Sequence, residues 1–534
     1  MLAALYLAWL ACSGLPSARA AEPAPSAGGQ PVTTASAARP PNIVMVFMDT
    51  LRADHVHCYG YDRPTSPNLD RLARQGTLFE NAVSQASFSL PSYATVFTSL
   101  YPSQHGMLES WKKLAPAAQT LAQVVAANGY RTAAFVGGGH LMPQYGLDRG
   151  FETYKSIGDF SSLFWTVPAA LGWLDSRGAD DKPFFLFVHG YDVHGPYGPP
   201  LGFAEMYDPG YEGVVHDTGF LNLEVLERMH ELHYDSARLD QFRDSHFQQP
   251  GMPWRARRLL PDFSTGLTDR DAADACAEPD RGEAPPAPRI GPGGLPYRLP
   301  PEPVPMSPAD VRHVTAHYDG ALNYADMWLG IFLDGLEKKG LLENSVVLVA
   351  GDHGEALGDH GRFGHGFELG EFTLHVPLVV SGPGIARDRR VGEVVELADL
   401  APTALDLAGM VPCHSHRGRS LRRHLHDPEP PFDPERAAFS LSVDEASIRT
   451  RDWFLYRHLS KRGGEVIEEY KLYDVQRDEA ETSDLASARP EVTARLKSRL
   501  LDWLEQTAPR SMGPKQKSTF DRAKKQLLRM FGYW

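Results

Sequence analysis

Runs of consecutive apolar residues recur along the chain, and each has the length of a single strand. Apolar runs without polar alternation are typical of strands that are buried on both faces of a parallel sheet. We therefore predict a central strand at each of the runs. The runs lie at Ile43–Met48, Thr132–Val136, Phe184–Val188, Ser345–Ala350 and Val376–Val380.

Segments with the apolar spacing of a helix separate these runs. Gly340 follows the longest of them, and a glycine is a common residue just past the end of a helix. Strands that alternate with helices predict a doubly wound α/β sheet. The helices are expected at Pro67–Gln75, Thr120–Asn128, Val311–Lys339 and Val492–Leu504.

Changes in local composition predict how the chain is divided. Residues 243–309 are dense in Pro, Gly, Asp and Arg, which indicates a surface insertion that either shapes a binding surface or is a disordered loop. The expected parts are a signal peptide (1–20), a flexible linker (21–40), a main α/β domain (41–411) that carries the insertion, a smaller α+β subdomain (412–505) and a basic tail (506–534).

The N-terminus has the pattern of an export signal. An apolar run at Leu2–Leu10 precedes Ala18-Arg19-Ala20, which has the small residues of a cleavage site. The run is too short to span a bilayer, so no transmembrane span is expected in the mature chain. We expect a periplasmic or extracellular protein, with a lipid anchor at Cys12 as a minor alternative.

Charge narrows the range of partners. The 534 residues carry a formal net charge of -14, and 42% of them are hydrophobic. A mildly acidic chain is a poor partner for nucleic acid, so we expect none.

Carboxylates and imidazoles follow several of the predicted strands. Asp49 follows the first strand, His140 and His194 follow the second and third, and Asp352 and His353 follow the fourth. An aspartate after a strand is more often a turn or cap residue. Strand ends of a parallel sheet meet at one edge, however, so several such residues together indicate a metal or catalytic centre.

Aspartate and histidine ligands without cysteine suit a divalent ion that activates an anionic ester. We expect one such ion, with calcium as the first choice and manganese, magnesium and zinc as alternatives. The other interpretation of the Asp352 segment is a glycine-rich turn with structural polar residues.

Ser89 is the candidate nucleophile. Pro91 fits the first turn of a helix, which would place Ser89 at the helix N-terminus. Backbone N–H groups and the helix dipole favour a bound anion there. The alternative is that Ser89 only caps the helix.

These motifs, in their order, resemble the sulfatase family of the alkaline-phosphatase-like superfamily, from about residue 41 to residue 505. Ser89-Leu90-Pro91-Ser92-Tyr93 falls where that family has its Cys/Ser-x-Pro-x-Arg signature. The other matching blocks are Pro41-Asn42-Ile43-Val44, Asp49-Thr50-Leu51-Arg52-Ala53-Asp54, Gly351-Asp352-His353-Gly354-Glu355, Gly364-His365-Gly366, His375-Val376-Pro377-Leu378 and Leu472-Tyr473-Asp474.

The resemblance implies an alkaline-phosphatase-like fold, a metal-dependent sulfuric ester hydrolase and a small-molecule or carbohydrate sulfate ester as its substrate. It further implies roles for individual residues. The metal ligands would be Asp49, Asp352 and His353, the nucleophile Ser89, and the pocket residues that bind the transferred group or protonate the leaving oxygen His140, His194 and His365.

The chain departs from the family pattern at four positions. Tyr93 replaces the signature Arg, Gly138 and His365 stand where the family has lysines, and Thr50 replaces a second acidic residue. Arg and Lys are the usual clamps for sulfate and phosphate oxygens. Without these clamps the pocket differs from that of a classical arylsulfatase. Tyr93 in place of the signature Arg leaves open whether Ser89 is converted to formylglycine.

Three functions remain open at this point. The first is the hydrolysis of sulfate esters. The second is the hydrolysis or transfer of phosphate esters by unmodified Ser89. The third is a binding protein that keeps the fold without catalysis. A lipase-like serine hydrolase is set aside, because the chain has no Gly-x-Ser-x-Gly sequence.

Overall fold

The computed structural model describes residues 39–507, except for 109–111, 179, 181, 196, 201, 213–306, 367, 427–430, 463–464 and 479. The expected signal peptide and nearly all of the linker, the insertion and the basic tail lie outside these residues. Within the described part of the chain, no helix combines the length and the apolar character needed to cross a bilayer.

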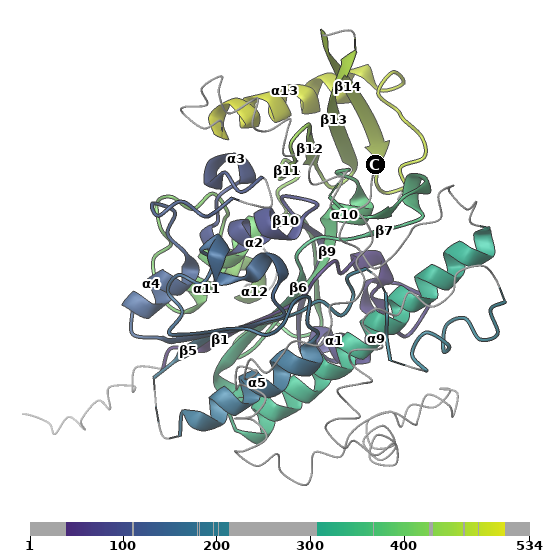
Figure 1. Ribbon diagram of the computed structural model, residues 1–534. Helices are drawn as coiled ribbons and strands as arrows, with labels where there is room; N and C mark the ends of the chain where they lie inside the picture. Colours follow the sequence, from purple (N-terminus) through teal and green to yellow (C-terminus); the bar gives the residue numbers. More distant parts are fainter. Residues whose placement is uncertain are drawn as a thin grey trace, which may run out of the picture. The chain divides into compact units, whose positions relative to one another are not determined.

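An eight-stranded sheet in the order β10-β2-β9-β6-β1-β5-β3-β4 forms the centre of the main domain (Figure 1). β9 runs antiparallel to both of its neighbours, and all other pairs are parallel. The strands are β1 (Asn42–Met48), β2 (Gly76–Val83), β3 (Arg131–Val136), β4 (Thr153–Ser156), β5 (Phe184–Gly190), β6 (Ser345–Gly351), β9 (His375–Ser381) and β10 (Arg389–Glu396). The prediction of a mostly parallel, doubly wound sheet is confirmed. β2, β4 and β10 were not predicted.

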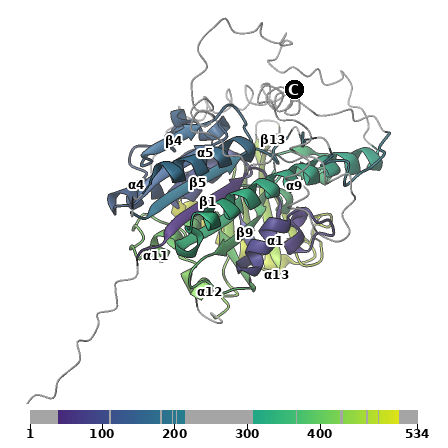
Figure 2. The same cartoon turned by 90° about the horizontal axis from the view of Figure 1, so that it is seen from below.

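Helices cover both faces of this sheet, as Figure 2 shows for α1, α5 and α9 on one of them. In β1, Ile43, Met45 and Phe47 belong to one core, and the residues between them belong to the other. This explains why the strand is apolar throughout. One face carries α1 (Pro67–Arg74), α5 (Leu163–Ser176) and α9 (Pro308–Lys338), and the other α2 (Ser89–Thr98), α4 (Leu121–Ala127), α11 (Leu400–Leu407) and the short α12 (Arg422–His426).

Local signals set the ends of the predicted helices. The Thr120 hydroxyl accepts a hydrogen bond from the Gln123 N–H at the start of α4, and Gly340, with φ +64°, follows α9. α5 was not predicted, because its sequence is apolar on nearly every side and contains Pro168. A helix without an amphipathic period gives no periodic signal.

A smaller antiparallel sheet follows the main domain, in agreement with the predicted C-terminal α+β subdomain. α13 packs on it through Leu496, Leu500 and Trp503. The elements are β11 (Ala438–Leu441), β12 (Glu445–Arg449), β13 (Trp453–Arg462), β14 (Glu465–Asp474) and α13 (Pro490–Thr507).

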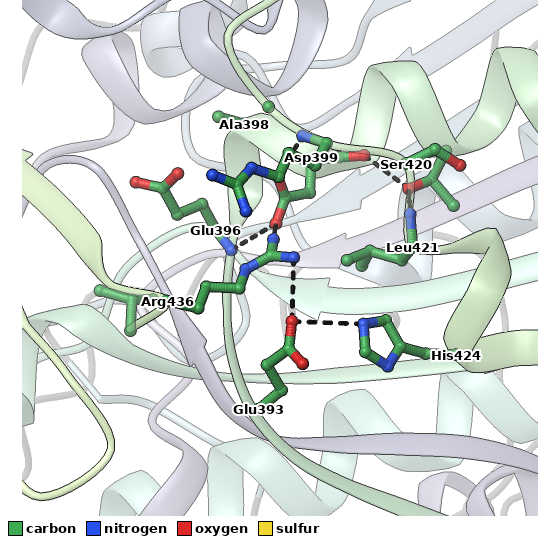
Figure 3. A network of polar contacts seen from close by, with 12 residues as sticks. Glu393, Glu396, Ala398, Asp399, Ser420, Leu421, His424 and Arg436 are labelled. Carbon is green, nitrogen blue, oxygen red and sulfur yellow. Dashed lines mark hydrogen bonds and ion pairs between the residues drawn. The ribbon is translucent and has the colours of Figure 1, made fainter. Parts of the chain in front are cut away.

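A buried polar network joins this subdomain to the edge of the main sheet (Figure 3). Arg436, just before β11, pairs with Glu393 of β10 and with Asp399. The Phe439 N–H donates to Glu396 Oε1 at 3.0 Å. Removing one partner of a buried ion pair costs about 3–5 kcal/mol, so loss of the Arg436 side chain should destabilise the contact between β11 and β10.

Candidate active site

The register of two neighbouring strands places the first acidic residues. β1 and β6 are parallel, and Met48 pairs with Gly351. The next residue of each strand is therefore an aspartate, Asp49 in one and Asp352 in the other. Together with His353 they offer ligand atoms that all lie within 4.8 Å of one another, and all three side chains are buried.

This cluster has the properties of a cation site. Burial raises the pKa of Asp49 to about 7, and burial together with the nearby Asp49 raises the pKa of Asp352 well above its ordinary value. Asp352 Oδ2 is buried and has no hydrogen-bond partner among the described residues. Two buried carboxylates side by side are costly unless a positive charge compensates them. The donor set therefore fits a divalent ion.

His353 is oriented for coordination. Its Nδ1 lies 2.8 Å from the Gly354 carbonyl oxygen, which can only accept a hydrogen bond. The proton therefore lies on Nδ1, and the lone pair of Nε2 is directed toward the two aspartates. Burial lowers the pKa of His353 well below its usual range, which keeps the ring neutral.

Thr50 shapes the same strand end through its backbone. It has φ +56°, in the left-handed region that β-branched residues rarely adopt. In this conformation the Thr50 N–H donates to Asp352 Oδ1 at 3.0 Å. A neutral residue at this position thus supports the second carboxylate through a backbone hydrogen bond.

Ser89 is the first residue of α2, and Phe88 occupies the cap position. The Ser89 hydroxyl lies 3.1 Å from His353 Nε2 and 3.5 Å from Asp49 Oδ1. Its oxygen therefore points into the acidic cluster.

Three further histidines surround this cluster. The rings of His365 and His353 are 4.6 Å apart, and those of His365 and His194 are 4.9 Å apart. Phe88 contacts the ring of His140 at 4.5 Å and that of His365 at 6.3 Å. The structure thus brings the predicted pocket residues together beside Ser89.

The charge of these imidazoles differs. Burial lowers the pKa of His140 to about 3 and that of His194 to about 4, so both rings are neutral. Burial also opposes charge on His365, but Glu355, whose Oε1 lies 3.0 Å from His365 Nδ1, raises its pKa. His365 is therefore the pocket imidazole best able to carry a proton at neutral pH.

Two residues that touch Asp49 were not assigned from the sequence. His189 Nε2 and Tyr93 Oη lie 3.4 and 3.5 Å from Asp49 Oδ2. His189 is the last residue but one of β5, which pairs with β1. The predicted strand ended at Val188, so extending it by one residue would have placed His189 at the catalytic edge.

Gly138, which stands where the family has a lysine, has φ +86°. A Cβ atom added there would lie 2.0 Å from the Gly158 carbonyl oxygen. Both the backbone angle and the contact therefore exclude a side chain at this position.

The fold and this edge of the sheet define the class of protein as a metal-dependent hydrolase. The family model of sulfatases matches residues 41–410, more than half of the chain, and the chain belongs to the sulfatase family. Enzymes of this family depend on a bound metal, and the cluster of Asp49, Asp352 and His353 is a possible site for it.

Similar proteins agree with this assignment. An N-acetylglucosamine-6-O-sulfatase of Bacteroides thetaiotaomicron is 23% identical, over 88% of this chain and 86% of the relative. A solved structure in complex with its substrate D-glucosamine-2-N,6-O-disulfate has a TM-score of 0.63 at 19% identity, and covers 88% of this chain and 98% of that chain. A phosphonate monoester hydrolase of Agrobacterium radiobacter has a TM-score of 0.58 at 19% identity, with coverages of 88% and 96%. At these identities the two structures show a shared fold.

Proposed function

We propose that the chain hydrolyses sulfate esters with Ser89, or the formylglycine derived from it, as the nucleophile. The observation that carries the proposal is the position of the Ser89 hydroxyl, 3.1 Å from His353 Nε2 at the start of a helix. When bound, a divalent ion held by Asp49, Asp352 and His353 would lower the pKa of the attacking hydroxyl and offset the charge of the substrate.

The chain's own groups account for the remaining requirements. The first-turn N–H groups of α2 would stabilise negative charge on the transferred group. His194 Nδ1 lies 2.5 Å from the Gly195 carbonyl oxygen, which can only accept a hydrogen bond. The neutral His194 ring therefore carries its proton on Nδ1, and its Nε2 can accept a hydrogen bond but not donate one. Protonated His365 would hold an oxygen of the sulfate or donate its proton to the leaving alkoxide.

The substrate class rests on the relatives. A glucosamine-6-O-sulfatase and a structure with a sulfated glucosamine are among the similar proteins. We propose a carbohydrate or other small-molecule sulfate ester as the substrate, hydrolysed after export. The identity of the metal stays a prediction. The imidazole of His353 among three donors suits manganese or zinc, whereas calcium usually takes six to eight oxygen ligands.

The decisive variant is Ser89→Ala. It removes the nucleophile, so kcat for sulfate esters should fall by at least about 10³-fold while the bound metal is retained. Ser92→Ala is the matched control, because Ser92 lies in the same helix and donates to the Asp352 backbone carbonyl at 2.6 Å. It should cost stability more than activity. Near-normal turnover of Ser89→Ala would exclude Ser89 as the nucleophile.

A second candidate is the hydrolysis or transfer of a phosphate ester by unmodified Ser89. It is favoured by the hydroxyl lying within the ligand cluster and by the loss of the family's cations at Tyr93 and Gly138. The mass of the peptide that contains Ser89 distinguishes the two chemistries, because formylglycine lacks two hydrogen atoms of serine. Unmodified serine and a phosphoserine intermediate would favour the phosphate ester.

A further inference from the structure

Two histidines one turn apart on α9 face each other and do not belong to the cluster of Asp49, Asp352 and His353. His313 Nε2 and His317 Nε2 are 3.1 Å apart, and their ring centroids are 4.6 Å apart at an interplanar angle of 67°. Both rings are partly buried. The spacing of four residues puts two imidazoles on one helix face, which is the arrangement that zinc-binding helices use.

The other nitrogen of each ring is held by an oxygen acceptor. His313 Nδ1 lies 2.9 Å from Asp208 Oδ2, and His317 Nδ1 lies 3.3 Å from the Tyr197 carbonyl oxygen. Carboxylate and carbonyl oxygens only accept, so each Nδ1 carries a proton, and in the neutral form of each ring Nε2 has a lone pair. Two such lone pairs repel, so a cation, either a proton or a metal ion, must lie between them.

The geometry suits a metal ion as that cation. Two nitrogens bound to one tetrahedral zinc at 2.0–2.1 Å would be about 3.3–3.4 Å apart, close to the observed 3.1 Å. A carboxylate on the outer nitrogen, as Asp208 provides, is a common second ligand shell for zinc-bound histidine. The Tyr211 ring stacks on His313 at 3.6 Å and fixes the plane of that imidazole.

We propose that His313 and His317 form a second metal site, suited to zinc and similar transition metals and separate from the catalytic cluster. Asp208 and Tyr197 lie on the segment that follows His194, whereas Tyr318, next to His317, donates to the Thr50 carbonyl oxygen at 2.8 Å. A bound ion would therefore link the segment that follows His194 to α9. The same helix contacts the backbone at Thr50, next to the proposed metal ligand Asp49.

To test this site, zinc binding is measured for the wild type and five variants of the full chain, after chelator treatment and dialysis. The wild type should bind about two zinc ions per chain, Asp352→Asn and His317→Ala about one each, and the double variant none. Asp208→Asn should weaken binding at the second site by about 10–100-fold. His426→Ala, which removes an exposed histidine of α12, is the control and should bind as the wild type does.

Two results would overturn the proposal. One is equal zinc binding by Asp352→Asn and by the double variant. The other is the absence of zinc binding by Asp352→Asn, which would mean that the two imidazoles share a proton. Should His317→Ala fail to fold, Cu²⁺ bound to Asp352→Asn provides a second measurement. Its electron paramagnetic resonance spectrum should show coupling to two imidazole nitrogens, and a spectrum without it would count against the site.

Discussion

The catalytic edge has two halves that are built differently. Asp49 and Asp352 follow directly after adjacent parallel strands, and the pairing of Met48 with Gly351 sets them side by side. His140 and His365 lie outside the main strands, on a short 3-10 helix and after β8 (Phe363–Gly364). The strand half, which contains the proposed metal ligands, is thus positioned by the register of the buried sheet. The loop half, which contains His140 and His365, is positioned by its loops and by contacts such as those with Phe88 and Glu355.

This difference teaches where variation is tolerated. A shift of the strand register would disrupt the whole core, so the acidic residues are fixed by the same contacts that fix the fold. Loops change with little cost to the core. Of the four residues that depart from the family pattern, Gly138 and His365 lie in the loop half, and Thr50 and Tyr93 lie beside the two aspartates. Asp49, Asp352 and His353 themselves keep the pattern.

The largest effect should come from breaking the strand half. Asp352→Asn removes one negative charge from the cluster, and we expect metal affinity to fall by more than the 10–100-fold typical of outer-shell changes. Turnover should fall with it. Metal analysis and kcat on the same preparation check this. Full metal occupancy in the variant would mean that Asp352 is no ligand.

A change in the loop half should depend on the substrate. His365→Gln removes the candidate proton donor, and we expect kcat to fall by about 10²–10⁴-fold for esters with a poor leaving group. Esters of p-nitrophenol need little protonation and should be much less affected. An equal loss for both kinds of ester would assign His365 to binding of the sulfate or to positioning.

A change of pH should alter the metal affinity of the strand half less than Asp352→Asn does. Since burial raises the pKa of Asp49 to about 7, the metal must displace a proton below that pH. Apparent metal affinity should therefore fall by about tenfold per pH unit for each proton displaced. Calorimetry at pH 5.5 and 8 in buffers of different ionisation enthalpy counts these protons.

The same shift predicts the stability of the metal-free protein. A raised carboxyl pKa stabilises the folded state fully below the unfolded value near 4, and this contribution is lost as the pH rises toward 7. Added metal should hence raise the melting temperature more at pH 8 than at pH 5.5. A shift independent of pH would contradict the buried carboxylate pair.

The smallest effect is expected for Tyr93→Phe. The Tyr93 hydroxyl lies 3.5 Å from Asp49 Oδ2, at the limit of a hydrogen bond. Its removal should change metal affinity by less than about tenfold, since a neutral hydrogen bond contributes about 0.5–1.5 kcal/mol. A loss of metal affinity as large as that of Asp352→Asn would mean that metal binding by the strand half requires the Tyr93 hydroxyl.

The sequence predicted the strand half more completely than the loop half. Continuous apolar runs predicted β1 and β6, and the residues after them include the acidic cluster. It did not predict β2 or β10, whose sequences include Glu80, Arg389 and Arg390, because charged residues interrupt the apolar pattern.

Contacts between distant segments carry no local signal. The pairing of His365 with Glu355, and the contact of His189 with Asp49, depend on loops and strands that only the folded chain brings together. Metal, nucleophile and pocket roles for the residues at this edge stay predictions until the variants above are measured.

Gly138 limits what single substitutions can achieve in redesigning this pocket. Gly138→Lys would restore the family's residue in the sequence without restoring its charge in space, because the backbone there has φ +86° and meets the Gly158 carbonyl oxygen. To place a lysine at position 138, the turn at Gly138 and the turn at Gly158 would have to be rebuilt together. The absence of a lysine at position 138 is therefore encoded in the path of the main chain, and a single substitution there does not restore its charge to the pocket.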